Sequence, residues 1–170
     1  MALWNKASSW FDQAVRRYQK PLTRYVRNIL RNLESAREIV QETFLRLWKN
    51  GLVEEGPPLR IWLYRTCRNL AIDILRKEGK MRLLKEGEEN DLVCPDELPA
   101  EKIEKQQLKA GLLQQLDTLP EKHQEVLRLK FQEELSYQEI SEVTGHSVSH
   151  VGVLLHTAIL TLRKGVRHDA

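Results

Sequence analysis

The chain has few cysteines, no long apolar run and no secretion signal. Only two of its 170 residues are cysteine, Cys67 and Cys94, and neither has the spacing or the partner motifs of a metal site. No apolar stretch approaches the ~18 residues that a membrane span requires. The first ten residues lack the basic and apolar regions of a signal peptide. We therefore expect a cytoplasmic protein that is not inserted in a membrane and whose two thiols are free.

Catalytic motifs are also missing. The sequence contains no glycine-rich phosphate loop, no nucleophile elbow and no HExxH pair. His146 and His150 are four residues apart, but no third ligand accompanies them, which argues against a metal site. We therefore expect no catalytic residue, no cofactor and no small-molecule substrate, and the protein should not be an enzyme.

Positive charge is concentrated in the first part of the chain. The formal net charge of +3 is the balance of three unequal parts. Residues 1–77 carry 15 Lys and Arg against 7 Asp and Glu, residues 78–107 carry 5 against 9, and residues 108–170 carry 7 against 8. The basic first part favours a polyanionic partner, whereas the near-neutral last part is unusual for a module that binds DNA.

Apolar residues recur at three- and four-residue spacing on both sides of an acidic stretch. Residues 86–101 hold seven acidic residues, two prolines and no Lys or Arg, a composition typical of an extended and poorly ordered linker. We therefore predict an all-α protein with two small helical domains, residues 1–80 and 106–170, joined by an acidic flexible linker at residues 81–105.

Local signals predict the first two helices of the first domain. One helix covers about residues 8–32, and Pro21 should kink it or begin a new helix there. The other covers residues 35–48 and should begin with a capping box formed by Ser35 and Glu38.

The predicted helix at residues 35–48 has a buried face and an outward face. The buried stripe consists of Ile39, Val40, Thr43, Phe44, Leu47 and Trp48. The outward face includes Glu38, Gln41, Glu42 and Leu45. Leu45 among these polar groups is an exposed apolar residue of the kind that can anchor a partner, although single exposed leucines are common.

The next predicted helix, residues 59–77, also has two faces. Its core stripe consists of Leu63, Cys67, Leu70 and Ile74. The other face presents Trp62, Arg65, Arg68, Asn69, Arg76 and Lys77. A stacking plane and cations for the phosphates are what single-stranded nucleic acid requires. Spacing alone leaves open the alternative that Trp62 is buried and the arginines are merely solvated.

The end of the chain is predicted to form a helix-turn-helix. Ser136 begins a capping box for a short helix that ends near Gly145, and Ser147 or Ser149 caps a longer second helix. The apolar positions of that second helix are Val151, Leu154, Leu155, Ala158, Ile159 and Leu162. Two helices joined by a short glycine-containing turn are typical of a DNA-binding unit. An ordinary helical hairpin in a bundle is the alternative.

Four segments, in this order, resemble those of a known family. They are residues 36–44 (AREIVQETF), 61–73 (IWLYRTCRNLAID), 119–120 (LP) and 136–140 (SYQEI). The chain thereby resembles the extracytoplasmic-function (ECF) sigma factors of bacterial RNA polymerase, and the resemblance covers nearly its whole length. The resemblance implies sigma domain two in residues 1–80, a linker in residues 81–105 and sigma domain four in residues 106–170.

The resemblance also implies a role for each surface of the first domain. In the family, the helix matching residues 35–48 docks on the clamp coiled coil of the largest polymerase subunit, so Glu38, Gln41, Glu42 and Leu45 are expected to contact core RNA polymerase. The next helix captures the melted non-template strand of the −10 element, so the aromatic and cationic face is expected to bind that strand. The acidic linker threads through the polymerase in the family, and a solvated tether is the alternative.

For the second domain the resemblance implies contacts with the −35 element of promoter DNA. The residues available for these contacts are His146, Ser147, Ser149, His150 and Val153. Family members usually carry several Lys or Arg along this helix. The corresponding positions here are Gly152, Leu154, Thr157 and Ile159. Basic side chains return only at Arg163 and Lys164, so a weak grip on duplex DNA is expected.

Two hypotheses of function follow. The first is a non-enzymatic initiation factor that directs core polymerase to promoters and helps to melt the −10 region. The second is a sigma-like adaptor or decoy whose C-terminal domain binds an activator or an anti-sigma factor, with Val153 and Leu154 as an exposed apolar face. A stand-alone helix-turn-helix repressor would leave the motifs of the first domain unexplained. An anti-sigma factor is a common partner in the family.

Overall fold

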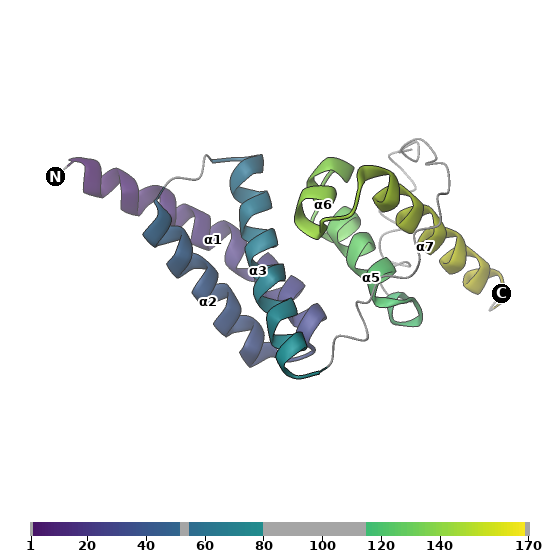
Figure 1. Ribbon diagram of the computed structural model, residues 1–170. Helices are drawn as coiled ribbons and strands as arrows, with labels where there is room; N and C mark the ends of the chain where they lie inside the picture. Colours follow the sequence, from purple (N-terminus) through teal and green to yellow (C-terminus); the bar gives the residue numbers. More distant parts are fainter. Residues whose placement is uncertain (1, 52–54, 80–114, 169–170) are drawn as a thin grey trace. The chain divides into compact units, whose positions relative to one another are not determined.

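The computed structural model describes residues 2–51, 55–79 and 115–168. Within these ranges every regular element is helical, which confirms the predicted all-α class (Figure 1). None of the helices so described is both long and apolar enough to cross a membrane. In the same ranges, no three histidine, cysteine or acidic side chains lie together as a metal site would require.

The chain divides into two compact units. We call Met1–Lys80 unit 1 and Met81–Ala170 unit 2, and each is described by itself. The predicted linker, residues 81–105, lies outside the described residues.

Unit 1 is a bundle of three helices, each of which packs against the other two (Figure 1). The helices are α1 (Ala2–Leu30), α2 (Leu33–Asn50) and α3 (Pro57–Lys77). Tyr25 of α1 meets Tyr64 of α3 edge to face, with their ring centroids 5.3 Å apart, and both side chains are buried. Burial of such side chains, at about 25 cal/mol per Å² of apolar surface, is the main favourable term that holds the three helices together.

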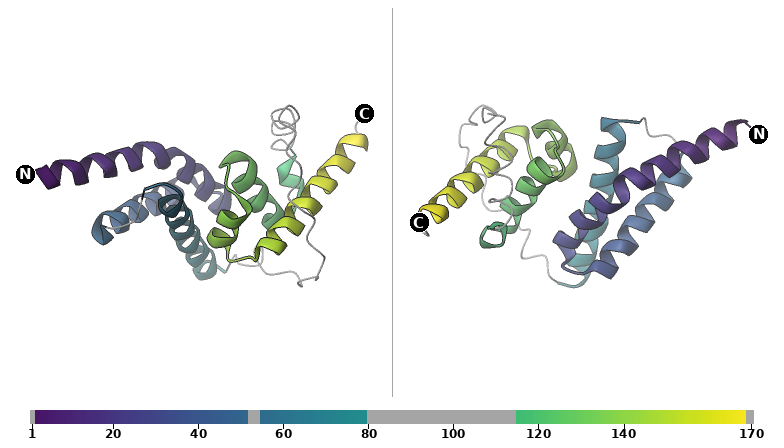
Figure 2. Two further views of the ribbon diagram at one scale, coloured as in Figure 1. Left: turned by 90° about the horizontal axis from the view of Figure 1, so that it is seen from above. Right: turned by 180° about the vertical axis from the view of Figure 1, so that it is seen from behind.

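Pro21 neither ends α1 nor begins a new helix. The helix runs through it without interruption, and the view from above in Figure 2 shows α1 curving along its length. A proline inside a helix removes one backbone hydrogen bond and crowds the preceding turn, so a bend is its usual effect. Of the two predicted outcomes at Pro21, the start of a new helix is wrong, because α1 continues through this residue.

The predicted capping box at Ser35 is wrong. Asn32 caps α2 instead, in an extended conformation, and its side-chain oxygen accepts a hydrogen bond of 3.0 Å from the backbone N–H of Ser35. Ser35 therefore lies inside the first turn of the helix. Asparagine is as good a cap as serine. At the other end Gly51 adopts the left-handed conformation, with φ of 67°, and its N–H donates to the carbonyl of Leu47.

The core stripes of α2 and α3 differ in part from the predicted ones. In α2 the prediction is confirmed from Ile39 to Leu47, but Trp48 is 44% exposed. In α3 the buried residues other than Tyr64 repeat every fourth position: Leu59, Leu63, Cys67, Ala71 and Leu75. Leu70 and Ile74, which the prediction placed in the stripe, are half-buried beside it.

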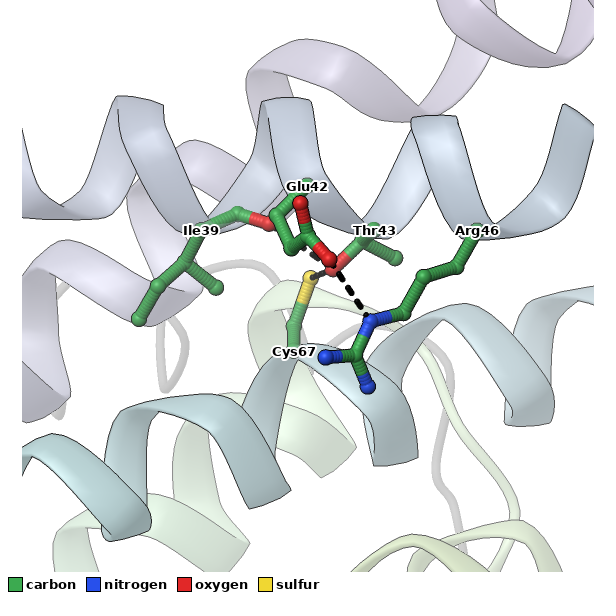
Figure 3. Close-up of polar contacts among 5 residues, drawn as sticks. All are labelled: Ile39, Glu42, Thr43, Arg46 and Cys67. Carbon is green, nitrogen blue, oxygen red and sulfur yellow. Dashed lines mark hydrogen bonds and ion pairs between the residues drawn. The ribbon is translucent and has the colours of Figure 1, made fainter. Parts of the chain in front are cut away.

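A buried polar contact joins α2 to α3 (Figure 3). The Thr43 hydroxyl donates to the backbone oxygen of Ile39 at 2.9 Å, and its Oγ1 lies 3.2 Å from the Sγ of Cys67. In this second contact either the hydroxyl or the thiol can be the donor. Burial raises the pKa of the Cys67 thiol to about 12, against a smaller lowering by the contact with Thr43.

Unit 2 is built around its last helix. The described elements are η2 (Leu116–Thr118), α5 (Glu121–Leu127), η3 (Arg128–Gln132), α6 (Tyr137–Thr144) and α7 (Val148–His168). Both α5 and α6 pack against α7. All six apolar positions predicted for the second helix of the helix-turn-helix are buried in α7, which confirms that prediction.

The caps on either side of the turn between α6 and α7 are those that the sequence predicts. Ser136 and Glu139 form the predicted capping box: the N–H of Glu139 donates to Ser136 Oγ at 3.1 Å, and the N–H of Ser136 donates to Glu139 Oε2 at 2.8 Å. Gly145 ends α6 with φ of 81°. Ser147 accepts a hydrogen bond from the N–H of His150 at 3.1 Å, so Ser147 rather than Ser149 caps α7.

We predict that Cys67 resists alkylation in the folded protein. The thiolate is the reactive form, and a buried thiol with a raised pKa forms very little of it near neutral pH. In a Cys94→Ser variant, where Cys67 is the only thiol, iodoacetamide should react at least about a hundredfold more slowly in buffer than in denaturing urea. The measurement is alkylation followed by mass spectrometry. Similar rates in the two conditions would contradict the buried position of this residue.

Candidate nucleic-acid and protein interfaces

The side of α3 opposite its buried stripe carries the predicted single-strand-binding residues. Arg65, Asn69, Arg76 and Lys77 are exposed, whereas Trp62 and Arg68 are half-buried. From Arg65 to Arg76 the helix rises about 16 Å, at 1.5 Å per residue. The exposed Asp73 is the one acidic side chain in the helix. Trp62 is not among the fully buried core residues.

The outward face of α2 carries the predicted polymerase-binding residues. Glu38, Gln41, Glu42 and Leu45 are all exposed, and Leu45 has 48% of its surface accessible. Glu42 Oε1 accepts a charged hydrogen bond of 2.9 Å from Nε of Arg46, one turn later in the helix (Figure 3). Such an exposed pair contributes at most a few tenths of a kcal/mol in stability, so the carboxylate can exchange this partner for another at little cost.

A groove that sequence reasoning missed lies between α1 and α2. Its volume is about 880 Å³, and Gln41 and Leu45 of the α2 face line one side. Its other apolar lining includes Phe11, Val15, Leu33, Val40 and Phe44. Its basic lining consists of Lys20, Arg24, Arg27 and Arg37. Trp48 packs against Phe11, with ring centroids 5.0 Å apart, which explains why this aromatic can remain half at the surface.

In unit 2 the predicted −35 residues gather around the start of α7. Ser147 and Ser149 are exposed, and His146, His150 and Val153 are half-buried. The rings of His146 and His150 lie close together, with centroids 4.9 Å apart and planes at 66°. The turn between α6 and α7 thus brings these five side chains together at one end of the helix.

Three of the four α7 positions at which basic residues were expected lie in the core. Gly152, Leu154 and Ile159 are buried, because α7 turns these positions toward α5 and α6. Lys or Arg could not occupy them without placing a charge in the core. The adaptor hypothesis placed Val153 and Leu154 in an exposed apolar face. Leu154 is buried and Val153 is half-buried, so the two do not form such a face. Of the four compared positions, only Thr157 is exposed.

A third histidine belongs to this region and was missed by sequence reasoning. His123 lies on α5, and its pKa is lowered first by burial and then by the charges of His150 and Lys122. Its Nδ1 atom is buried and has no hydrogen-bond partner. No spacing rule links His123 to His150, 27 residues later, because their proximity depends on how α5 packs on α7.

Each of the two units matches a known protein family model. The family model described as Sigma-70 region 2 matches residues 14–81, and the model described as Sigma-70 region 4 matches residues 115–164. The first match includes α2 and α3 in full, and the second runs from η2 through most of α7.

Full-length relatives point to one family. The chain is 30% identical over 158 residues to the RNA polymerase sigma factor YlaC of Bacillus subtilis, a match that covers 91% of each protein. It is also 30% identical to the ECF RNA polymerase sigma factor SigW of the same organism, over 92% of this chain and 89% of SigW. SigE of Mycolicibacterium smegmatis is 30% identical over 91% of this chain and 60% of SigE. The chain therefore belongs to the ECF sigma factors.

We predict that acid selectively destabilises unit 2 through His123. In the unfolded chain this histidine titrates near pH 6.5, whereas burial lowers its pKa in the folded protein. Stability is therefore fully present above about pH 6.5 and is lost as pH falls toward the lowered pKa, because the unfolded chain binds the proton more readily. A His123→Gln variant should lose less stability than the unchanged protein between pH 7 and about pH 5.

The measurement is urea unfolding followed by far-ultraviolet circular dichroism at each pH. Tryptophan fluorescence serves as the control, because all four tryptophans precede residue 80 and all five histidines lie at or after residue 123. The fluorescence midpoint of His123→Gln should match that of the unchanged protein at every pH. Equal acid sensitivity of the two proteins by circular dichroism would refute the assignment to His123.

Proposed function

We propose that this ECF sigma factor directs core RNA polymerase to a class of promoters and helps to open the −10 region. The observation that carries the proposal is one side of α3, where an exposed amide and several exposed cations accompany the half-buried Trp62 within the region 2 match. The proposed division of labour is a polymerase- and −10-binding domain at residues 1–80, a linker at residues 81–105 and a −35-binding domain at residues 106–170.

The α3 face fits a melted DNA strand better than a duplex. A single strand exposes its bases, and Trp62 would offer one of them a stacking surface while Arg65 and Lys77 meet phosphates. Asn69 can donate and accept hydrogen bonds to a base edge. Binding a strand in this unpaired form shifts the equilibrium toward open DNA without any catalytic group.

The α2 face fits a basic protein helix pair. Glu38 and Glu42 supply negative charge, and Leu45 supplies an exposed apolar anchor between them and the groove. Apolar anchors surrounded by charged residues are typical of the centre and rim of a protein interface. We assign this face to the clamp coiled coil of the largest polymerase subunit.

The start of α7 is assigned to the −35 element. Exposed Ser149 can donate to a phosphate or a base edge, and His146 and His150 can do the same. An adaptor or decoy that binds an anti-sigma factor or an activator is the second candidate, because the exposed positions of α7 carry no Lys or Arg before Arg163. Binding of the full chain to duplex DNA would support the −35 assignment and argue against the adaptor or decoy.

We predict that Leu45→Asp weakens polymerase binding. Aspartate cannot make the apolar contact of the Leu45 side chain, and its carboxylate would lose hydration when the interface buries it, so affinity should fall by about a hundredfold. The measurement is association of the purified protein with core polymerase by biolayer interferometry, followed by transcription from a pool of genomic promoter fragments.

The matched control is Leu160→Asp, since Leu160 is 42% exposed but lies on α7. It should retain core binding. If the unchanged protein neither binds core polymerase nor supports specific initiation, the proposed function is wrong. If Leu45→Asp binds as well as the unchanged protein, only the assignment of the α2 face is wrong.

We predict that Arg65→Ala weakens capture of the −10 strand. Loss of one phosphate contact should lower the affinity of the holoenzyme for a fluorescein-labelled non-template strand by about tenfold and reduce the salt slope by about 0.7. The control is Arg16→Ala, which removes an exposed arginine from α1. Equal losses in the two variants would indicate a general charge effect and would contradict a specific site on α3.

A further inference from the structure

The region that contains the helix-turn-helix has no permanent positive charge. The 32 residues from 131 to 162 include α6 and most of α7 and contain neither Lys nor Arg. They contain three histidines: His146, His150 and His156. The other side chains assigned to the −35 element, Ser147, Ser149 and Val153, carry no charge. Only histidine can give this surface positive charge, and it does so near or below neutral pH.

Two of these histidines are held close together at the start of α7. The centroids of the His146 and His150 rings are 4.9 Å apart. The backbone of His150 is fixed by its hydrogen bond to Ser147 Oγ, and His146 follows Gly145 in the turn. The spacing of the two imidazoles is therefore set by the turn itself, so both can meet one phosphate or two adjacent phosphates of a strand.

Titratable side chains on α5 and α6 belong to the elements that pack with α7. On α5, His123 and Lys122 are the neighbouring titratable groups, and the charge of His150 already acts on His123. On α6, Glu139 is engaged with the backbone of Ser136, and Glu142 accepts a hydrogen bond from Gln138 at 3.2 Å. Two imidazolium ions at this distance also repel each other.

An anionic ligand favours the charged forms of the two histidines. A phosphate between or beside the rings attracts the protonated forms and accepts charge-assisted hydrogen bonds from them, which raises their proton affinity in the complex. Each histidine that becomes charged on binding also displaces about one counterion from the DNA. Binding and protonation then reinforce each other, because any ligand that prefers the protonated form increases its population.

We propose that His146 and His150 form a proton-dependent phosphate-binding site, so that unit 2 binds duplex DNA more tightly as pH falls below neutral. The inference rests on the proposed function, since it takes the start of α7 as the −35 surface. It adds that the strength of this contact is set by pH. The −10 contact has no such dependence, because residues 1–122 contain no histidine.

The test measures binding of the full chain, alone and as holoenzyme, to two fluorescein-labelled probes. One is the upstream duplex of a promoter that the holoenzyme transcribes, and the other is the −10 non-template strand. From pH 8 to about pH 6, affinity for the duplex should rise by about tenfold or more, and the salt slope should steepen by about one to two. Affinity for the single strand should change less than about threefold.

The double variant His146→Gln/His150→Gln should bind the duplex with the same affinity at both pH values. Glutamine keeps a hydrogen-bond donor but cannot become charged. The matched control is His156→Gln, which removes a half-buried histidine one and a half turns further along α7 and should keep the pH response. Circular dichroism at each pH checks that both variants are folded.

The outcomes separate the inference from the proposed function. Duplex binding that does not change with pH, or that changes equally in the double variant, overturns the proton-dependent site and leaves the −35 assignment intact. Absence of duplex binding at every pH, in both the free and the holoenzyme form, overturns the −35 assignment and the inference together. Core binding and −10 capture are measured separately and decide the rest of the proposed function.

Discussion

Unit 1 depends on the way α3 is buried. Its core residues repeat every fourth position, from Leu59 to Leu75, and such a row forms a ridge inclined by about 26° to the helix axis. Helices that pack along these ridges cross at an angle, as α3 does against α1 in Figure 1. The opposite side of α3 is thereby left open along its length, and this is the side that carries Arg65 and Asn69. The proposed strand-binding face is thus a direct result of the helix packing.

Sequence reasoning succeeded where the cause is local. The capping box of Ser136 and Glu139, the left-handed Gly145 and the buried positions of α7 all follow from residues within a few positions of one another. It failed where two residues are equally good candidates for one role, or where packing against another helix determines which residues are buried. Asn32 and Ser35 are both good caps, and nothing in the sequence chooses between them. Leu70 and Ile74 fit a helical period as well as Ala71 and Leu75 do, and only the direction of packing selects the second pair.

The candidate sites show the same limit. The outward positions of α2 and α3 could be read from periodicity, and their exposure agrees with that pattern. For α7, the absence of the family's usual basic residues at Gly152, Leu154 and Ile159 suggested that DNA contacts are missing. These three residues are buried in the core instead. The groove between α1 and α2 and the proximity of His123 to His150 arise from tertiary contacts between segments distant in the chain. No single helix contains a signal for either.

The half-buried His123 and the pair His146 and His150 would give the protein two opposite responses to acid. Protonation of the unfolded chain draws unit 2 toward unfolding, while protonation at the start of α7 would draw it toward DNA. A ligand that binds only the folded form offsets unfolding by mass action. In an acidified cell, the sigma factor engaged at a promoter would therefore outlast the unengaged copies, which proteases could remove first. Promoter occupancy and protein lifetime would then be coupled through one pair of neighbouring helices.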